Sequence, residues 1–521
     1  MVISIFKETP PPARESSEGI TVSNGSVAAG GASAAGASPA GVCAPPRPRG
    51  QGHCTFPNRA QSSGNVKWLW PVDRESLSFH LVHNHGTRMG LYHMRLNSAS
   101  PLKTEDVERA LFHLQRKNPA LRVDLRLREN VWWFCEQEGI KVDFKMLSEG
   151  TSSEEEIQRM CEGGFPDGAT WKFRMIPLGK DAPCAIPEVK GDFPYQYSIM
   201  VTGHHALGDG LSASLVAKQM VELLNDVILG CHVSDEVSSR FVQREELGEI
   251  ESRIIKKLEE DPERHDYVKQ TMPTSTPLLL QAFPRPSVDR AATRHLSRIV
   301  DVEVTRKFEK QCKSHGVTIN SAFSAVINIA LIRLVQKSGI SQQSYQIASN
   351  HAVSMLRYLK RTPRDVVGGY AVLRSHISKV TDNHAKNFWE YATEINGELR
   401  EGLTSELPLE QKMARLMAQP NHWKEWAQNP PAVVHDYGIT NIGHFPMPER
   451  RVDDQVLVTD AASVAMVHKY IHMLLFLVHT FRGRCNYSIS YATDHIADET
   501  AILLADEVMA VYQEVSEVNG M

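Results

Sequence analysis

The chain has 521 residues, a formal net charge of −4 at pH 7, 42% hydrophobic residues and 23% charged residues. This length suits more than one domain, and the composition is that of an ordinary globular protein. The nearly neutral charge gives no reason to expect nucleic acid or an anionic membrane surface as a partner. The eight cysteines are scattered and form no C-x-x-C pair, so the sequence indicates neither a zinc ribbon nor a thioredoxin-type redox site.

Residues 1–65 differ in composition from the rest of the chain. They are rich in Gly, Ala, Ser and Pro and offer little to bury, so they predict a disordered low-complexity tail, either passive or used for targeting. The N-terminus lacks the basic start and apolar core of a secretory signal. No stretch reaches the roughly 18 apolar residues of a transmembrane helix. We therefore expect a cytoplasmic protein with no transmembrane segment.

The folded part is expected to begin near residue 66. Residues 104–118 predict an amphipathic helix, with Thr104 as its N-cap and acidic residues in its first turn. Aromatic or alternating patterns predict strands at 130–137, 170–178 and 195–203. These elements form an N-terminal half that we place at 66–270.

Four prolines between 271 and 292 predict a linker, and the pattern then restarts in a C-terminal half at 293–521. The helix at 318–335, with Thr318 as N-cap, is apolar on every side and should be buried nearly all round. The remaining patterns predict strands at 294–304, 346–355, 370–380, 462–480 (with a bend) and 485–493, and helices at 305–315 and 498–515. The fold class is therefore mixed α/β (α+β) in two halves, and we expect a monomer.

One short segment indicates a candidate catalytic site. HHALGDG, which runs from His204 to Gly210, follows the strand at 195–203 and precedes a helical apolar pattern. A turn at the end of a strand is a rigid place from which a side chain can enter a cleft. By composition alone, the pattern HHxxxDG arises in roughly a few per thousand chains of this kind.

The histidines do not predict a metal site. Neighbouring side chains on an extended segment point to opposite faces, and no third ligand with familiar spacing is near. A second histidine cluster, HLVHNH at 80–85, is typical of a polar surface strand or loop. The chain contains no G-x-S-x-G, no phosphate loop and no dinucleotide-binding turn.

The remaining interpretation is that one histidine of the segment acts as a general base. A neutral imidazole takes a proton from a hydroxyl or amine as that group attacks an acyl carbonyl. Asp209 could orient His205 directly or could brace the turn through an ion pair. Gly208 and Gly210 permit a tight turn.

The segment HHALGDG resembles the HHxxxDG motif of the condensation-domain and alcohol acetyltransferase-like superfamily, whose fold is akin to that of chloramphenicol acetyltransferase. Further segments are similar to family segments in the same order: NPALRVDLRLRENVWW, GVTINSAFSAVINIAL, SNHAVSMLRYL and YGITNIG, at 118–133, 316–331, 349–359 and 437–443. Asp436-Tyr437-Gly438 is similar to the DFG of plant acyltransferases of this superfamily. The resemblance covers roughly residues 66–515.

The resemblance implies two subdomains in a V, each a mixed sheet covered by helices, with the active-site tunnel between them. It implies that His205 is the catalytic base, without a covalent acyl-enzyme. His204 and Asp209 would be structural, with Asp209 bridging to Arg357, and Gly210 would keep the site open. Apart from the resemblance, either backbone N–H groups or a hydroxyl such as that of Thr440 could stabilise the oxyanion, and Thr440 and Asn441 are candidate oxyanion or substrate contacts.

These features predict a standalone acyltransferase that moves an acyl group from a thioester, acyl-CoA, to an alcohol or amine. It would need no cofactor beyond that co-substrate. Two alternatives stay open at this point. The chain could be a condensation or ester-forming enzyme that uses a carrier protein in trans, or a catalytically silent binding protein of the same fold.

Overall fold

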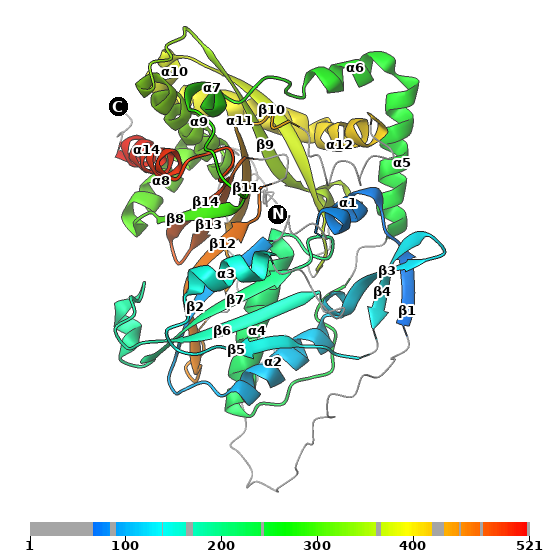
Figure 1. Cartoon of the computed structure of the whole chain (residues 1–521), viewed down its shortest axis with the longest axis vertical. Coiled ribbons are helices and arrows are strands. Elements are labelled where there is room, and N and C mark those ends of the chain that lie inside the picture. The colour runs from blue at the N-terminus through cyan, green and yellow to red at the C-terminus, as the bar shows by residue number, and fades with distance from the viewer. Residues whose placement is uncertain are drawn as a thin grey trace, which may run out of the picture. The chain divides into compact units, whose positions relative to one another are not determined.

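The computed structural model describes residues 66–83, 90–137, 139–162, 170–240, 244–360, 366–418, 432–447, 450–468 and 473–517 (Figure 1). The tail expected at 1–65 lies outside the described residues. The described part is mixed α/β, as the sequence predicts, with two large sheets and one small sheet.

The first large sheet has the strand order β12-β2-β7-β6-β5. Helices α2 (Thr104–Lys117) and α4 (Gly210–Leu229) cover one face, and α3 (Ser153–Glu162) covers the other (Figure 1). Each face carries an apolar cluster, so the central strands are buried on both sides. The strands are β2 (Gly90–Ser98), β5 (Asp143–Met146), β6 (Trp171–Leu178), β7 (Tyr195–Gly203) and β12 (Val456–Ala465).

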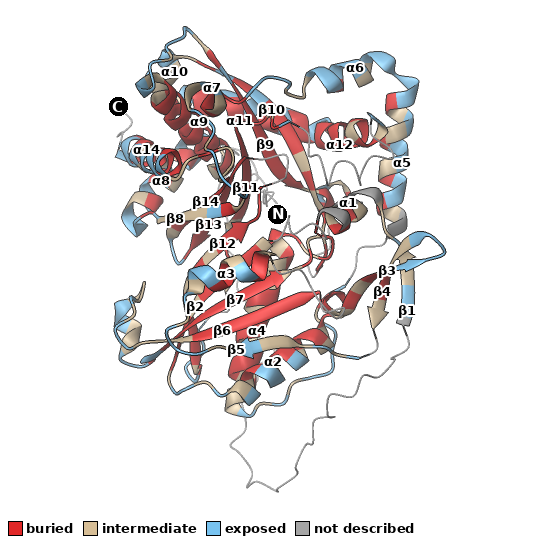
Figure 2. Cartoon of the chain, in the orientation of Figure 1, coloured by how far each residue is buried: buried red, intermediate tan, exposed pale blue. Residues whose placement is uncertain are grey.

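The second large sheet has the order β10-β9-β11-β13-β14-β8. Helices α8, α9, α11 and α14 pack on one of its faces and form the largest apolar cluster with it (Figures 1 and 2). Its strands are β8 (Thr293–Ile299), β9 (Tyr345–Ser354), β10 (Ala371–Val380), β11 (Tyr437–His444), β13 (Leu474–Phe481) and β14 (Arg484–Ala492). The helices are α8 (Val302–Ser314), α9 (Ile319–Lys337), α11 (Phe388–Thr404) and α14 (Asp498–Glu517).

Helix α9 is buried nearly all round, as predicted, and the Thr318 side chain caps it by accepting from the Ser321 N–H. Within the described residues, it is the one helix that is long and apolar enough to cross a membrane. Because 83% of its most apolar window is buried inside the fold, it reads as a core helix.

The small sheet, β1-β4-β3, lies beside helix α1 (Arg74–His83). Its strands are β1 (Val66–Pro71), β3 (Val123–Arg128) and β4 (Val131–Gln137). The prediction of a polar surface strand or loop at 80–85 is wrong for its described part. His80 and His83 lie on α1, and both are buried.

Most elements predicted from periodicity are confirmed within one to three residues, and three predictions are wrong in detail. The N-cap of α2 is Lys103, with no side-chain bond, and Thr104 is the first helical residue. The strand expected at 294–304 ends at Ile299, because Asp301 caps α8 by accepting from the Glu303 N–H. The bent strand expected at 462–480 is two strands, β12 and β13, which lie in different sheets.

The two halves of the fold are not separated at a single point in the sequence. Strand β12 belongs to the first sheet, although it was placed in the C-terminal half. Helix α5 (Arg244–Glu260), placed in the N-terminal half, packs with α12 (Leu407–Ala418) against β9 and β10. The predicted linker at 271–292 contains helix α7 (Leu278–Ala282), whose first two leucines are buried in the second core. Helices α6 (Pro262–Gln270) and α10 (Asp382–Lys386) complete the described helices longer than four residues.

Candidate active site

The histidine motif forms a turn between β7 and α4. The His204 N–H donates to the carbonyl oxygen of Thr170 at 2.9 Å, which continues the sheet pairing past the end of β7. The Leu207 N–H donates back to the His204 carbonyl at 2.8 Å and closes the turn. Because α4 begins at Gly210, the rigid strand and helix fix both sides of the turn.

Asp209 braces this turn. Its carboxylate accepts from the Ser212 N–H at 2.9 Å, as the N-cap of α4, and from the Tyr370 N–H at 3.1 Å. The hydroxyl of Ser212 bonds both backbone groups of Gly368, which doubles the link between the turn and the segment before β10. A carboxylate with two backbone donors at a helix N-terminus is well stabilised without a cation.

The predicted bridge from Asp209 to Arg357 is wrong. Within the described residues, Asp209 accepts only these backbone N–H groups, and no ion pair joins it to an arginine. Arg357 lies in a short 3-10 turn, Met355–Tyr358, where its side chain is exposed and its guanidinium sits 5.8 Å from the ring centre of Tyr358. The charged end of an exposed arginine stays in water, which leaves the brace to the backbone.

His204 belongs to a buried cluster of histidines. Its Nδ1 accepts from the Ala206 N–H, so its Nε2 carries the hydrogen and donates to Nδ1 of His80 at 3.2 Å. The ring of His83 lies 4.3 Å from that of His204, centre to centre. Burial lowers the pKa of His80 and His83 to about 4 and holds the pKa of His204 well below its usual value. His204 is therefore placed as a neutral structural residue.

The rings of this cluster stack and tilt against one another instead of converging on a common point. Over the described ranges, no group of three or more His, Cys, Asp or Glu side chains has an arrangement that could hold a metal ion. The chemistry of the cluster is that of packed neutral imidazoles.

His205 is half-buried, and its ring stacks on Phe79 of α1 with centres 4.4 Å apart and planes 9° apart. It lines two cavities, one on each side, that differ in character. The apolar cavity is lined by Gly90, Leu91, Tyr92, Trp171, Val201, Gly203, His205, Gly208, Asp209, Gly210, Ala213, Ser463 and Val464. The polar cavity is lined by Asp73, Ser76, Phe79, His205, Ala206, Asp209, Leu247, Glu251, Met355, Gly369, Tyr370, Ala371 and Lys412.

The glycines of the turn are required by close packing. A Cβ atom at Gly203 would lie 2.8 Å from the Trp171 ring, and one at Gly208 would lie 3.0 Å from it. The indole is therefore seated directly under the histidine turn and forms a wall of the apolar cavity. Gly210 also lines this cavity, and its carbonyl accepts from the Tyr92 hydroxyl at 2.7 Å.

Thr440 and Asn441 lie on β11 and are buried, but neither is among the described residues that line the two cavities. Asn441 Oδ1 accepts from the Gly443 N–H at 2.8 Å and so supports its own strand. The structure does not bring either residue to His205.

Asp436 is also structural. It accepts from the backbone N–H groups of Leu278 and Ala348 at 2.6 and 2.9 Å, which ties α7 to β9. Burial raises the pKa of Asp436 to about 7. Like Thr440, it lines neither of the two cavities at His205.

Sequence reasoning missed the walls of the site. Phe79, Trp171 and Lys412 come from three separate segments, and no spacing in the chain relates them to His205. Lys412 is 5% exposed, and its Nζ donates to Glu251 Oε1 at 2.9 Å, so it meets the polar cavity as half of an ion pair. The apolar position of Trp171 on β6 was visible in the sequence, but its contact with the glycines was not.

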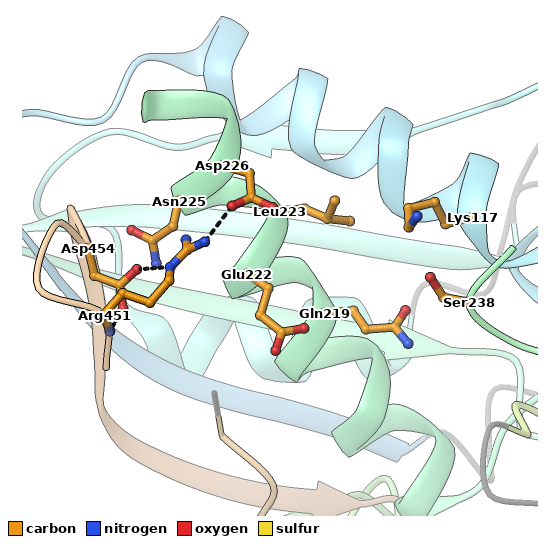
Figure 3. A pocket seen from close by; sticks show the side chains of 9 residues that line it. All are labelled: Lys117, Gln219, Glu222, Leu223, Asn225, Asp226, Ser238, Arg451 and Asp454. Carbon is orange, nitrogen blue, oxygen red and sulfur yellow. Dashed lines mark hydrogen bonds and ion pairs between the residues drawn. The ribbon is translucent and has the colours of Figure 1, made fainter. Parts of the chain in front are cut away.

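A cavity larger than these two, of about 310 Å³, lies elsewhere, beside the C-terminal half of α4 (Figure 3). Arg451 crosses it to Asp226 at 2.7 Å and to Asp454 at 2.9 Å, and burial raises the pKa of Glu222. His205 is not among its lining residues. These ion pairs fasten α4 to the segment before β12, so the size of this cavity does not make it the reaction site.

Among curated proteins, the chain is similar to part of a much larger synthetase. No family model matches the chain. The nonribosomal peptide synthetase kk1B of Curvularia clavata is 19% identical over 258 residues, which are 48% of this chain and 2% of that protein. The chain therefore corresponds to a small part of that relative.

Two solved structures cover nearly the whole described fold. TRI3 trichothecene 15-O-acetyltransferase from Fusarium sporotrichioides has a TM-score of 0.62 and 11% identity, over 86% of this chain and 95% of that one. The condensation domain of the Monacolin K polyketide synthase MokA has a TM-score of 0.59 and 12% identity, over 87% and 98%. The chain thus has the two-subdomain, chloramphenicol acetyltransferase-like fold that these two structures share, which confirms the predicted fold class.

Proposed function

We propose that the protein is a cytoplasmic acyltransferase that moves an acyl group from a thioester, acyl-CoA, to an alcohol or amine. The observation that carries the proposal is the position of His205, whose imidazole lines an apolar cavity on one side and a polar cavity on the other. Two substrates of opposite character can therefore meet at one base. The similarity of the fold to acetyltransferases and condensation domains supports a reaction of this class.

The chemistry needs one base. His205 takes the proton of the acceptor hydroxyl or amine as the oxygen or nitrogen attacks the acyl carbonyl carbon. The tetrahedral oxyanion collapses, the carbon–sulfur bond breaks, and His205 returns the proton to the departing thiolate. The enzyme forms no covalent bond, so holding both substrates beside His205 supplies much of the rate.

The linings suggest which substrate lies where. The apolar cavity offers aliphatic and aromatic walls and suits the acyl chain. The polar cavity contains Asp73, Ser76 and the Lys412–Glu251 pair, and it suits the acceptor. On this view Phe79 and Trp171 are the two flat walls between which the reacting atoms are held.

A second candidate is a reaction in which the thioester is carried by a carrier protein in trans. It is favoured by the match to a nonribosomal peptide synthetase. The third reading, a silent binding protein, predicts no turnover with either kind of thioester.

The test is release of free thiol from acyl-CoA, acyl-pantetheine and acyl carrier protein, each with a panel of alcohols and amines. The control variant is His232→Ala, because His232 is an exposed loop histidine. Turnover with acyl-CoA that His205→Ala removes and His232→Ala keeps supports the proposal. Turnover with the carrier protein alone supports the second candidate, and none with any donor supports the third.

A further inference from the structure

The cavity beside the C-terminal half of α4 is separate from the site at His205. It has a volume of about 310 Å³, at the lower end of the range for small-molecule sites. Among the described residues, none that lines it also lines a cavity at His205. Glu222 lies 12 residues beyond the first residue of α4, Gly210, so about 18 Å of helix separates it from the histidine turn. The chain thus has room for a second small molecule outside the reaction site.

One end of the cavity carries an excess of negative charge. The guanidinium of Arg451 donates to Asp226 at 2.7 Å and to Asp454 at 2.9 Å, so two carboxylates share one cation. Within the part of the chain that the structure describes, no acidic or histidine cluster could hold a metal ion. This end therefore offers a ligand a negative potential and no metal site.

Glu222 lies between this end and the opposite one (Figure 3). Its ion-pair partner among the described residues is Lys218, one turn earlier on α4, whose Nζ is 3.8 Å from Glu222 Oε1. That distance is too long for a hydrogen bond. Burial raises the pKa of Glu222, and the nearby Asp226 carboxylate raises it further. A bound ammonium group would supply the close cation that the ionised Glu222 lacks.

The opposite end of the cavity carries a positive charge. Lys117 Nζ donates to Ser234 and to the carbonyl oxygen of Glu236, and no described carboxylate pairs with it. Gln219 Oε1 accepts from Asn118 Nδ2 at 2.7 Å, which identifies the Gln219 oxygen and turns its N–H groups away from Asn118.

Two hydrogen-bond donors at this end have no partner among the described residues. They are Nε2 of Gln219 and the hydroxyl of Ser238, and both residues line the cavity. The Ser238 N–H donates to the Lys117 carbonyl oxygen at 2.8 Å, which holds Ser238 beside that lysine. An amide and a hydroxyl next to an ammonium group are suitable donors for a carboxylate.

We propose that this cavity binds a small zwitterion, an amino acid, with its carboxylate at Gln219 and Ser238 and its ammonium group at Glu222. Gln219 and Glu222 are one turn apart on α4, so their Cβ atoms are about 5–6 Å apart. Leu223 also lines the cavity and offers an apolar surface to the carbon chain. A ligand with one charge satisfies one end only. The inference goes beyond the proposed function, because it requires no acyl transfer.

The experiment is isothermal titration calorimetry of the full chain with γ-aminobutyrate, whose two charges are joined by three methylene groups. Butylamine and butyrate, at equal ionic strength, each keep one of these charges. We expect γ-aminobutyrate to bind at least ~10-fold more tightly than either, because each lost contact is a hydrogen bond to a charged group. Equal affinity for butylamine, equal affinity for butyrate, or no binding of γ-aminobutyrate at ~10 mM overturns the proposal.

Glu222→Gln tests the ammonium contact with little change of size. The variant should bind γ-aminobutyrate at least ~10-fold more weakly than the wild type does. The control is Glu259→Gln, an exposed residue of α5 outside the cavity, which should bind like the wild type. Equal affinity in Glu222→Gln and Glu259→Gln overturns the proposal.

Gln219→Leu is the second variant, and it should lose affinity for γ-aminobutyrate through the carboxylate contact, so the test stands even if Glu222→Gln fails to fold. His205→Ala should bind γ-aminobutyrate as the wild type does, because the two sites share no described residue. A loss of binding in His205→Ala would place the ligand in the reaction site and overturn the proposal. If the wild type releases no thiol from any acyl-CoA, the proposed function fails, and these titrations still decide whether the cavity binds a zwitterion.

Discussion

The carboxylate of Asp209 accepts a hydrogen bond from the backbone N–H of Tyr370 at 3.1 Å and so joins the histidine turn to the segment that leads into β10 of the second large sheet. The same carboxylate caps α4. Asp209 is therefore a brace that holds both walls of the polar cavity in register, and it acts on catalysis through the position of His205.

Asp209→Ala should destabilise the protein by about 2 kcal/mol, the sum of a lost helix cap and a lost hydrogen bond to a carboxylate. Arg357→Met should leave the free energy of unfolding nearly unchanged, because its side chain is exposed. In a double-mutant cycle followed by denaturant unfolding, the two changes should add. A coupling of more than about 1 kcal/mol would restore Arg357 as a partner.

His205→Ala should reduce turnover ~10²–10⁴-fold, the usual effect of losing a general base. Stability should change little, because the ring is only half-buried. The measurement is thiol release together with a melt of the same sample. A folded variant with near wild-type turnover contradicts the assigned role.

Gly90→Val should shorten the acyl chains that the enzyme accepts. Gly90 lines the apolar cavity, and a Cβ atom there would meet no described atom within 4 Å, so added methyl groups should fill the cavity without a clash. We expect kcat/KM to fall ~10–200-fold for the longest accepted acyl-CoA and to stay unchanged for acetyl-CoA.

The control for this change is Gly397→Val, on the exposed side of α11, which should alter neither profile. A Gly90→Val variant that loses all donors equally, or that changes the preference among acceptors instead, contradicts the assignment of the acyl chain to the apolar cavity.

The histidine cluster makes the fold sensitive to acid. Burial lowers the pKa of His83 to about 4, aided by the nearby His80 and Lys172, whereas an unfolded histidine titrates near 6.5. Between these values the unfolded chain binds a proton that the folded chain does not. Stability should therefore be full above pH 6.5 and fall as the pH drops toward 4.

Denaturant unfolding of the wild type and His83→Gln at several pH values between 7.5 and 4.5 checks this. The variant should lose less stability on acidification, because one titrating group is gone. Identical slopes would show that other buried histidines, such as His93, carry the effect.

Much of the fold could be predicted from the sequence because its strong elements carry strong local patterns. The uninterrupted apolar run of α9 and the alternation of side chains in β6 predicted both the kind of element and its residue range. The failures lie where a tertiary contact decides. The buried side of α1 is set by packing against His204. The Asp209 carboxylate accepts from one backbone N–H, that of Tyr370, more than 150 residues away, which no side-chain pattern predicts.

The place of β12 constrains how the chain is made. It pairs with β2 from Val456↔Ser98 to Ala465↔Gly90, and so completes a sheet whose other strands lie before residue 204. During synthesis, β2 stays an unpaired edge strand until some 250 residues beyond β7 have been made. Until then its N–H and C=O groups can pair with another strand. An expression fragment that ends before Val456 keeps that edge permanently, and it should self-associate where the full chain does not.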